Sequence, residues 1–261
     1  MTAPIIPAST ILMLRDSHEL EVLMVQRHHQ IEFAAGALVF PGGKLAKEDG
    51  DPAWGGHLDG AGEDGTATAL KIAAIREAFE ESGLLLARPA SRRGVGEPLL
   101  HPDEAQALFS AAPGEAPAGA FQAAIRGAGL VLALDALTLF SNWQTPELPA
   151  LPKRFDTYFF LAVAPPDQVA VCDGREAVNL CWIAPVKALA DAAERRRTIV
   201  FPTRMNLEML GRSKSAAGAI ADARARPRMK VEPEVIVQDG ARMLRIPPEA
   251  GYSVTLEPLW L

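Results

Sequence analysis

The sequence predicts a protein of the α/β (α+β) class. Two early apolar runs, residues 9–14 and 20–27, have strand composition, and a segment with helical spacing follows at 66–82. Late in the chain, residues 155–164 are rich in aromatic residues, as strands are, and a further strand and a helix come after them. Strands on both sides of a central helix indicate a sheet with helices packed on it.

The first part of the chain predicts strands separated by turns. A polar turn at residues 16–18 joins the two early strands, and residues 38–40 end a third strand. Residues 41–43 read Pro-Gly-Gly and turn out of that strand, and glycine there lets the backbone approach a ligand closely. Residues 44–65 are acidic and rich in glycine, which predicts a long loop, and residues 84–86 predict a short buried strand.

The central helix has a predicted start, a buried stripe and a predicted end. Thr66 or Thr68 can cap the first turn, since a hydroxyl satisfies a free N–H there. Gly83 stands where a left-handed residue ends a helix. The stripe repeats at i, i+3 and i+7 with Ile72, Ile75 and Phe79.

The second half of the chain begins with an alanine-rich segment that predicts an inserted helical cap at residues 88–130. Its helices are predicted at 102–110 and 118–128. The remaining predicted elements are strands at 137–143, 155–164 and 177–183, helices at 185–196 and 202–210, and a hairpin at 235–246 around an Asp-Gly turn.

Composition fits a soluble enzyme. The chain has 261 residues, 49% of them hydrophobic, and a net charge of −6, which argues against a binder of nucleic-acid backbones. Cys172 and Cys181 form no Cys-x-x-Cys motif, which favours a reducing compartment. The chain shows no signal-peptide pattern and no stretch long enough to span a membrane, so the cytoplasm is the expected location.

Three carboxylates gather at the end of the central helix. Glu77, Glu80 and Glu81 are spaced i, i+3 and i+4, which places them on one face. Like charges this close repel one another, and a hard divalent cation such as Mg2+ removes the repulsion because it prefers oxygen ligands. Arg76 is close enough to hold one carboxylate in a fixed rotamer. The alternative is a solvated acidic face.

The segment at 76–84, Arg-Glu-Ala-Phe-Glu-Glu-Ser-Gly-Leu, resembles the signature of the Nudix hydrolases. That signature also has a glutamate eight residues before the arginine and a glycine six residues before the glutamate. Thr68 and Gly62 stand at those two places here. We therefore expect Gly42 and Gly43 to be the functional glycines, with residues 44–65 inserted between them and the helix.

The chain is also similar to one branch of the family, which contains the mammalian peroxisomal coenzyme A diphosphatase. The two insertions and the run Arg-Phe-Asp-Thr-Tyr-Phe-Phe at 154–160 carry this resemblance. A neighbouring branch of coenzyme A hydrolases has a leader that ends in Phe-Pro-Gly-Gly, as residues 40–43 do here, with residues 23–27 and Gly36 before them.

The resemblance implies a Nudix-type α/β/α sandwich with a mixed sheet. Residues 1–261 would form one Nudix hydrolase domain with insertions at about 44–65 and 88–130. It further implies that Glu77, Glu80 and Glu81 bind Mg2+ or Mn2+, and that Arg76 orients Glu77 as part of the catalytic set.

The resemblance implies cleavage of a diphosphate linkage in a small-molecule nucleoside diphosphate derivative. Coenzyme A or acyl-CoA is the expected substrate, giving 3′,5′-ADP and (acyl-)4′-phosphopantetheine. The expected substrate-binding residues are Arg27, Phe40, Gly42 and Gly43. The candidates for the general base are Glu176 and Glu147.

Two other functions stay open. One is an enzyme acting on ADP-ribose, NADH or a sugar nucleotide. The other is a non-catalytic Nudix module that senses a ligand, against which the intact glutamates speak. No nucleic-acid or membrane partner is expected, and the sequence leaves a homodimer open.

Overall fold

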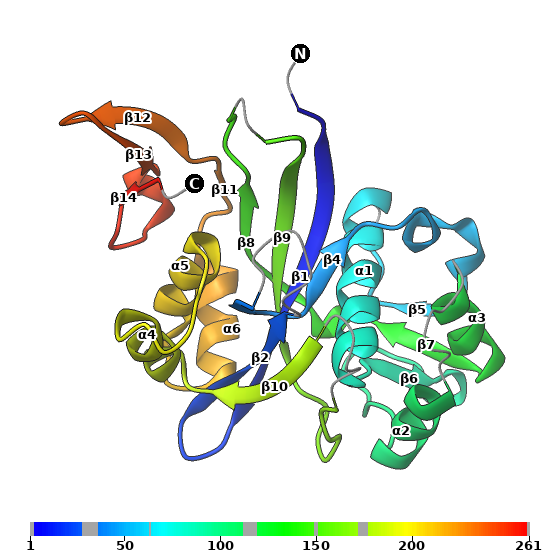
Figure 1. The fold of residues 1–261 in the computed structure, drawn as a ribbon. Helices are drawn as coiled ribbons and strands as arrows, with labels where there is room; N and C mark the ends of the chain where they lie inside the picture. The colour runs from blue at the N-terminus through cyan, green and yellow to red at the C-terminus, as the bar shows by residue number, and fades with distance from the viewer. Residues whose placement is uncertain are drawn as a thin grey trace.

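The computed structural model describes residues 3–27, 36–62, 64–111, 119–148, 151–171 and 177–259. These residues form the predicted α/β/α sandwich, in which a mixed sheet lies between helices on both of its faces (Figure 1). The predicted fold class is therefore confirmed.

The main sheet has the strand order β10-β2-β1-β9-β8-β11, with β3 paired to β2 and β4 paired to β1. Strand β1 pairs in parallel with β9 and antiparallel with β2, which makes the sheet mixed. The strands are β1 (Ile5–Asp16), β2 (Leu20–Arg27), β3 (Leu38–Val39), β4 (Gly42–Lys44), β8 (Thr138–Gln144), β9 (Arg154–Val163), β10 (Ala177–Ile183) and β11 (Lys230–Val231).

The central strands are apolar on both faces because helices cover both. In β1, Ile11 and Met13 belong to the core cluster on the α1 face, whereas Leu12 and Leu14 belong to the cluster on the opposite face. Successive side chains of a strand point to opposite sides, so a strand buried on both faces is a continuous apolar run.

Helix α1 (Gly65–Ser82) lies on one face of the main sheet, and a second, small sheet lies beyond it (Figure 1). This small sheet has the order β5-β7-β6 and draws on both predicted insertions or their borders. Its strands are β5 (Leu58–Asp59), β6 (Ala87–Pro89) and β7 (Leu130–Ala133). The helices in the same parts of the chain are α2 (Pro102–Ala111), α3 (Ala120–Gly127) and the 3-10 helices η1 (Lys47–Gly50), η2 (Pro52–Trp54), η3 (Ala90–Arg92) and η4 (Leu134–Ala136).

The opposite face of the main sheet is covered by α4 (Pro185–Ala193), α5 (Phe201–Leu210) and α6 (Ala216–Ala225). A C-terminal sheet follows, with β12 (Glu234–Gln238), β13 (Ala241–Arg245), β14 (Leu256–Pro258) and the 3-10 helix η5 (Pro248–Ala250). The hairpin turn has positive φ at Asp239 and Gly240, as its Asp-Gly sequence predicts. Among the helices of the described ranges, none combines the length and the apolar character that a membrane span needs.

Several local predictions were wrong. Helix α1 is capped by Asp64, whose carboxylate accepts hydrogen bonds from the N–H groups of Thr66 and Ala67, and not by a threonine. Residues 84–86 are buried but form no strand, since the side-chain amide of Gln168 bonds both backbone groups of Leu85. The predicted loop at 44–65 contains η1, η2 and β5, and helix α6 was not foreseen.

An aromatic cluster joins the two insertions to α1. The ring of Phe121 in α3 lies 5.9 Å from Trp54 of the first insertion and 5.7 Å from Phe79 of α1, measured between centroids. Aromatic pairs at this distance stabilise a core beyond the area they bury. The described part of the predicted helical cap thus packs on the Phe79 side of α1.

We expect Phe121→Ala to lower the free energy of unfolding by about 3–5 kcal/mol, as for other buried aromatic side chains. Urea unfolding followed by circular dichroism measures the loss. Val95→Ala is the control, because Val95 lies in the same segment with 74% exposure. Similar losses for the two variants would show that the cluster does not stabilise the fold.

Candidate active site

The site is organised around Arg76 in the last part of α1. Its Nη1 donates to Glu77 Oε1 at 2.7 Å and to Glu80 Oε2 at 2.9 Å. Its Nε and Nη2 donate to the two carboxylate oxygens of Asp49 at 2.9 and 3.0 Å, and Nη2 also donates to the Lys44 carbonyl at 3.1 Å. One guanidinium therefore connects the glycine turn, the first insertion and two of the predicted carboxylates.

Asp49 is the residue of this cluster that the sequence-based prediction did not include. Its side chain is 1% exposed and binds Arg76 through both oxygens, a bidentate geometry that is stronger than a single neutral hydrogen bond. Asp49 Oδ2 also accepts a hydrogen bond from the Ala46 N–H at 2.8 Å, which holds η1 against the helix.

The surroundings of Arg76 keep its positive charge. Burial alone would lower the pKa of its guanidinium, but the hydrogen bond to Asp49 and the charges of Glu77, Asp49 and Glu80 outweigh burial. The pKa of Arg76 is therefore raised above its ordinary value, so the guanidinium stays charged at every physiological pH.

The glycine turn packs directly on two glutamates of α1. A Cβ atom at Gly43 would lie 2.4 Å from Glu77 Oε1, so no larger residue fits there unless Glu77 moves. The Gly42 N–H donates to Glu81 Oε2 at 3.3 Å. The glycine backbone thus lies close to these two carboxylates, and its predicted approach to a ligand stays a prediction.

Each of the three glutamates has its own environment. The side chain of Glu77 is 12% exposed, that of Glu80 is 42% exposed, and Glu81 is buried beside Gly42. Within the described residues, no group of three or more His, Cys, Asp or Glu side chains is arranged to hold a metal ion. Glu77 and Glu80 meet at the Arg76 guanidinium, whereas Glu81 turns toward the glycine turn.

Other predicted site residues lie in different places. Arg27 ends β2 half-buried, and its buried Nε has no hydrogen-bond partner among the described residues. Phe40 is 3% exposed and packs edge-on against Phe159 in the core that faces α4–α6, so its side chain has a packing role. Glu147 is exposed beyond the end of β8, two strands away from β1.

Two predictions fall outside the described residues. They concern Glu176, the other candidate for the general base, and Cys172. Cys181 is a free, partly buried cysteine on β10.

A signal for Asp49 was present in the sequence. Counting six residues from Gly43, the step that the Nudix signature has between its glycine and its outer glutamate, reaches Asp49. Thr68, which we placed at the outer position, lies inside the first turn of α1. Asp49, inside the first insertion, therefore stands at the outer position, and the rest of that insertion lies between it and the helix.

An α/β/α sandwich with a glycine turn packed on an Arg-Glu-x-x-Glu-Glu helix is the arrangement of a Nudix hydrolase. A family model described as the NUDT19 Nudix domain matches residues 63–209, more than half of the chain, so the chain belongs to this family of Nudix hydrolases. The matched region includes Arg76 and the three glutamates, whereas Gly42, Gly43 and Asp49 precede it.

The chain is similar to curated and structurally characterised proteins. It is 26% identical over 231 residues to the acyl-coenzyme A diphosphatase NUDT19 of Xenopus laevis, covering 75% of this chain and 60% of that protein. It is 29% identical over 209 residues to the protein of the same name from Homo sapiens, covering 64% of this chain and 54% of that protein. The chain thus spans little more than half the length of these relatives.

Among solved structures, a Nudix hydrolase from Alicyclobacillus acidocaldarius is similar with a TM-score of 0.68 and 28% identity. The match covers 85% of this chain and 97% of that chain.

We expect Asp49→Asn to lower the hydrolytic turnover number by about 10- to 100-fold, the usual cost of losing a residue that supports metal ligands or catalytic groups. Asparagine keeps the shape of Asp49 but cannot pair its charge with Arg76. Steady-state kinetics measures the change. Glu48→Gln is the matched control, since Glu48 binds Trp54 Nε1 through its backbone carbonyl, which the substitution leaves in place. Equal turnover numbers for the two variants would show that Asp49 does not support catalysis.

Proposed function

We propose that the protein hydrolyses the diphosphate linkage of coenzyme A or acyl-CoA, with Mg2+ or Mn2+ as cofactor, to give 3′,5′-ADP and (acyl-)4′-phosphopantetheine. The observation that carries the proposal is the carboxylate cluster that Arg76 and the Gly42-Gly43 turn hold at the end of α1. Arg76 offsets part of the repulsion among these like charges, and a divalent cation would offset the rest.

The donor chemistry fits a hard divalent cation. The side chains at the site offer carboxylate oxygens, which Mg2+ and Mn2+ prefer, and Gly43 leaves the backbone beside Glu77 uncovered. Glu80 is exposed enough to turn away from Arg76 toward an ion. We propose that Glu77, Glu80 and Glu81 provide the ligands.

The chain's own residues would prepare the reaction in three ways. Arg76, fixed by Asp49, holds Glu77 in place while Glu80 moves. The Arg27 guanidinium, whose Nε has no partner among the described residues, suits a phosphate oxygen because its planar fork matches that geometry. Glu147 or Glu176 would accept the proton of the attacking water. A bound divalent cation would neutralise the phosphoryl charges and activate that water.

The choice of coenzyme A is supported by the relatives, two of which are named acyl-coenzyme A diphosphatase. We propose that the whole chain acts as one Nudix hydrolase domain with its two insertions. ADP-ribose, NADH and sugar nucleotides remain the competing substrates, and a ligand-sensing module without activity remains the competing class. The cytoplasmic location and the homodimer remain predictions.

Removal of divalent metal tests the cofactor. We expect hydrolysis to stop after dialysis against EDTA and to return with Mg2+ or Mn2+, because the phosphoryl charges otherwise repel the nucleophile. Product release is followed by chromatography. Undiminished hydrolysis after exhaustive chelation would exclude the proposed role of the cation.

The same assay identifies the substrate. It compares coenzyme A, acyl-CoAs, NADH, ADP-ribose and sugar nucleotides, and mass spectrometry of products formed in 18O-water shows which phosphoryl group is attacked. Ready cleavage of a sugar nucleotide beside inert coenzyme A and acyl-CoAs would favour the competing enzyme. No cleavage of any of these compounds would favour the sensing module.

Substitution of the glutamates tests the site. We expect Glu80→Gln and Glu81→Gln each to lower turnover by about two to three orders of magnitude, since each removes a charged ligand of the proposed cation that stabilises the transition state. Thermal unfolding should show that both variants fold, and Glu48→Gln is again the control. Rates near that of the control would mean that this helix face is a solvated acidic surface.

A further inference from the structure

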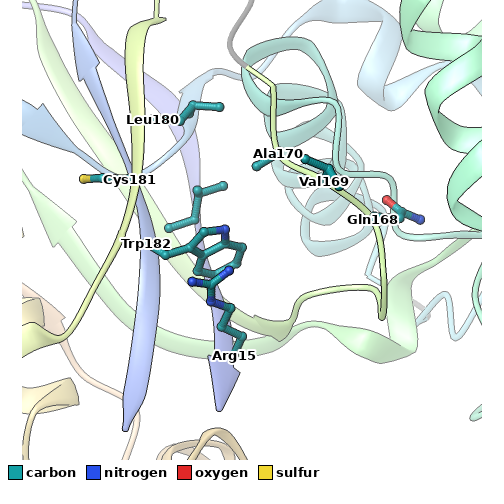
Figure 2. A pocket seen from close by; sticks show the side chains of 8 residues that line it. Arg15, Gln168, Val169, Ala170, Leu180, Cys181 and Trp182 are labelled. Atoms are coloured by element: carbon teal, nitrogen blue, oxygen red, sulfur yellow. The ribbon is translucent and has the colours of Figure 1, made fainter. Parts of the chain in front are cut away.

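A pocket of about 250 Å³ lies on the α1 face of the main sheet, and Arg76 is not among its lining residues. Figure 2 shows the side chains that line it. Its floor is formed by Leu23 of β2 and by Leu180 and Trp182 of β10. Its opposite wall is the segment 168–170, which belongs to the connection that follows β9. Cys181 borders the pocket, but its sulfur points away from it in Figure 2.

The wall offers an apolar surface to the pocket. The Gln168 amide is used by the backbone, because Oε1 accepts from the Leu85 N–H and Nε2 donates to the carbonyls of Leu85 and Leu100. Val169 is 72% exposed and is one of the exposed large hydrophobic residues of the described chain. A concave site lined mainly by apolar side chains is typical of small-molecule binding.

Two elements of the chain connect the pocket with the proposed catalytic site. The Val171 N–H donates to the carbonyl of Ser82, the residue after Glu81, so the connection that forms the wall is attached to the end of α1. The floor continues along the same strand pair to Arg27, since Trp182 pairs with Leu23 and Ala177 with Arg27. Leu23 and Arg27 are four positions apart on β2, which is a distance of roughly 13 Å along the strand.

Among the described residues that line the pocket, Arg15 is the only charged one. Its Nε and Nη2 both lie 2.7 Å from Glu21 Oε2, so this cation is already paired. The Arg15 guanidinium also stacks over the Trp182 ring at 4.4 Å, as Figure 2 shows. An anion such as the 3′-phosphate of coenzyme A would meet a guanidinium already paired with a carboxylate, whereas an uncharged chain would meet leucine, valine and indole.

We propose that this pocket binds the acyl chain of the substrate, on Leu23, Leu180 and Trp182 and against Val169. The inference rests on the proposed function and deepens it, because it assigns substrate specificity to residues outside the signature helix. The pocket has a limited volume of about 250 Å³, so a chain of limited length fills it.

The proposal predicts a dependence on chain length. Each buried methylene group stabilises binding by about 0.8 kcal/mol, which corresponds to roughly a fourfold gain in kcat/KM. We expect kcat/KM of the protein to rise from coenzyme A through butyryl-CoA to octanoyl-CoA, by at most this factor per methylene. It should then level off for palmitoyl-CoA, because the pocket is full.

Val169→Glu tests the pocket without touching the catalytic cluster. The substitution puts a carboxylate at the mouth of the pocket, so kcat/KM should lose its rise with chain length while coenzyme A itself changes less than about twofold. Val237→Glu is the matched control, since Val237 is 73% exposed on β12, in the C-terminal sheet. It should behave like the unchanged protein.

Three results would overturn the proposal. One is a flat chain-length profile in the unchanged protein, and another is a Val169→Glu profile identical to that of Val237→Glu. The third is an equal loss for coenzyme A, ADP-ribose and acyl-CoAs in Val169→Glu, which would assign the pocket to the nucleotide end.

Binding separates this inference from the proposed function. Isothermal titration calorimetry in EDTA compares the binding of S-octyl-CoA with that of coenzyme A. We expect S-octyl-CoA to bind more tightly and Val169→Glu to remove this difference. That result would support the pocket even if no CoA ester is hydrolysed. Equal affinity of the two ligands for the unchanged protein would reject the pocket even if coenzyme A proves to be the substrate.

Discussion

The buried ion-pair cluster of Arg76 is the interaction on which the site depends. Arg76 and Asp49 are both largely removed from water, and such burial costs several kcal/mol per ion unless partners compensate. Arg76 compensates by using all five of its N–H donors, on Asp49, Glu77, Glu80 and the Lys44 carbonyl. If the helix end and the glycine turn moved apart, Arg76 would lose a partner and leave a buried charge unpaired. The cluster therefore fixes these two elements relative to each other.

The cluster also explains how a long insertion can divide the signature. Chain entropy changes only slowly with loop length, so the cost of the insertion is modest if its two ends are held together. Asp49 holds one end on Arg76, and Asp64 caps the start of α1 at the other. Between them, Trp54 packs on Phe121, which joins the first insertion to the second. The insertions thereby buttress α1 from the side opposite the main sheet.

The sequence predicted what depends on local pattern and missed what depends on partners distant in the chain. The apolar runs predicted β1 and β2, and Gly83, with φ of 70°, ends α1 as expected. Leu84 to Leu86 have strand composition, but the bonds of Leu85 go to Gln168, which no local pattern reveals. Phe40 was placed in the site because it precedes the glycines, yet strand alternation turns it to the other face.

Helix α1 connects the two proposed parts of the site. Its glutamates and Arg76 face the glycine turn, while the Ser82 carbonyl at its C-terminal end anchors the connection that walls the pocket. In the proposed arrangement, a change in the pocket alters which substrate is held without altering how the carboxylates are positioned, because the two parts share a helix and no side chain. One fold can serve many substrates when the reacting groups lie on a fixed helix end and a connecting segment selects the substrate.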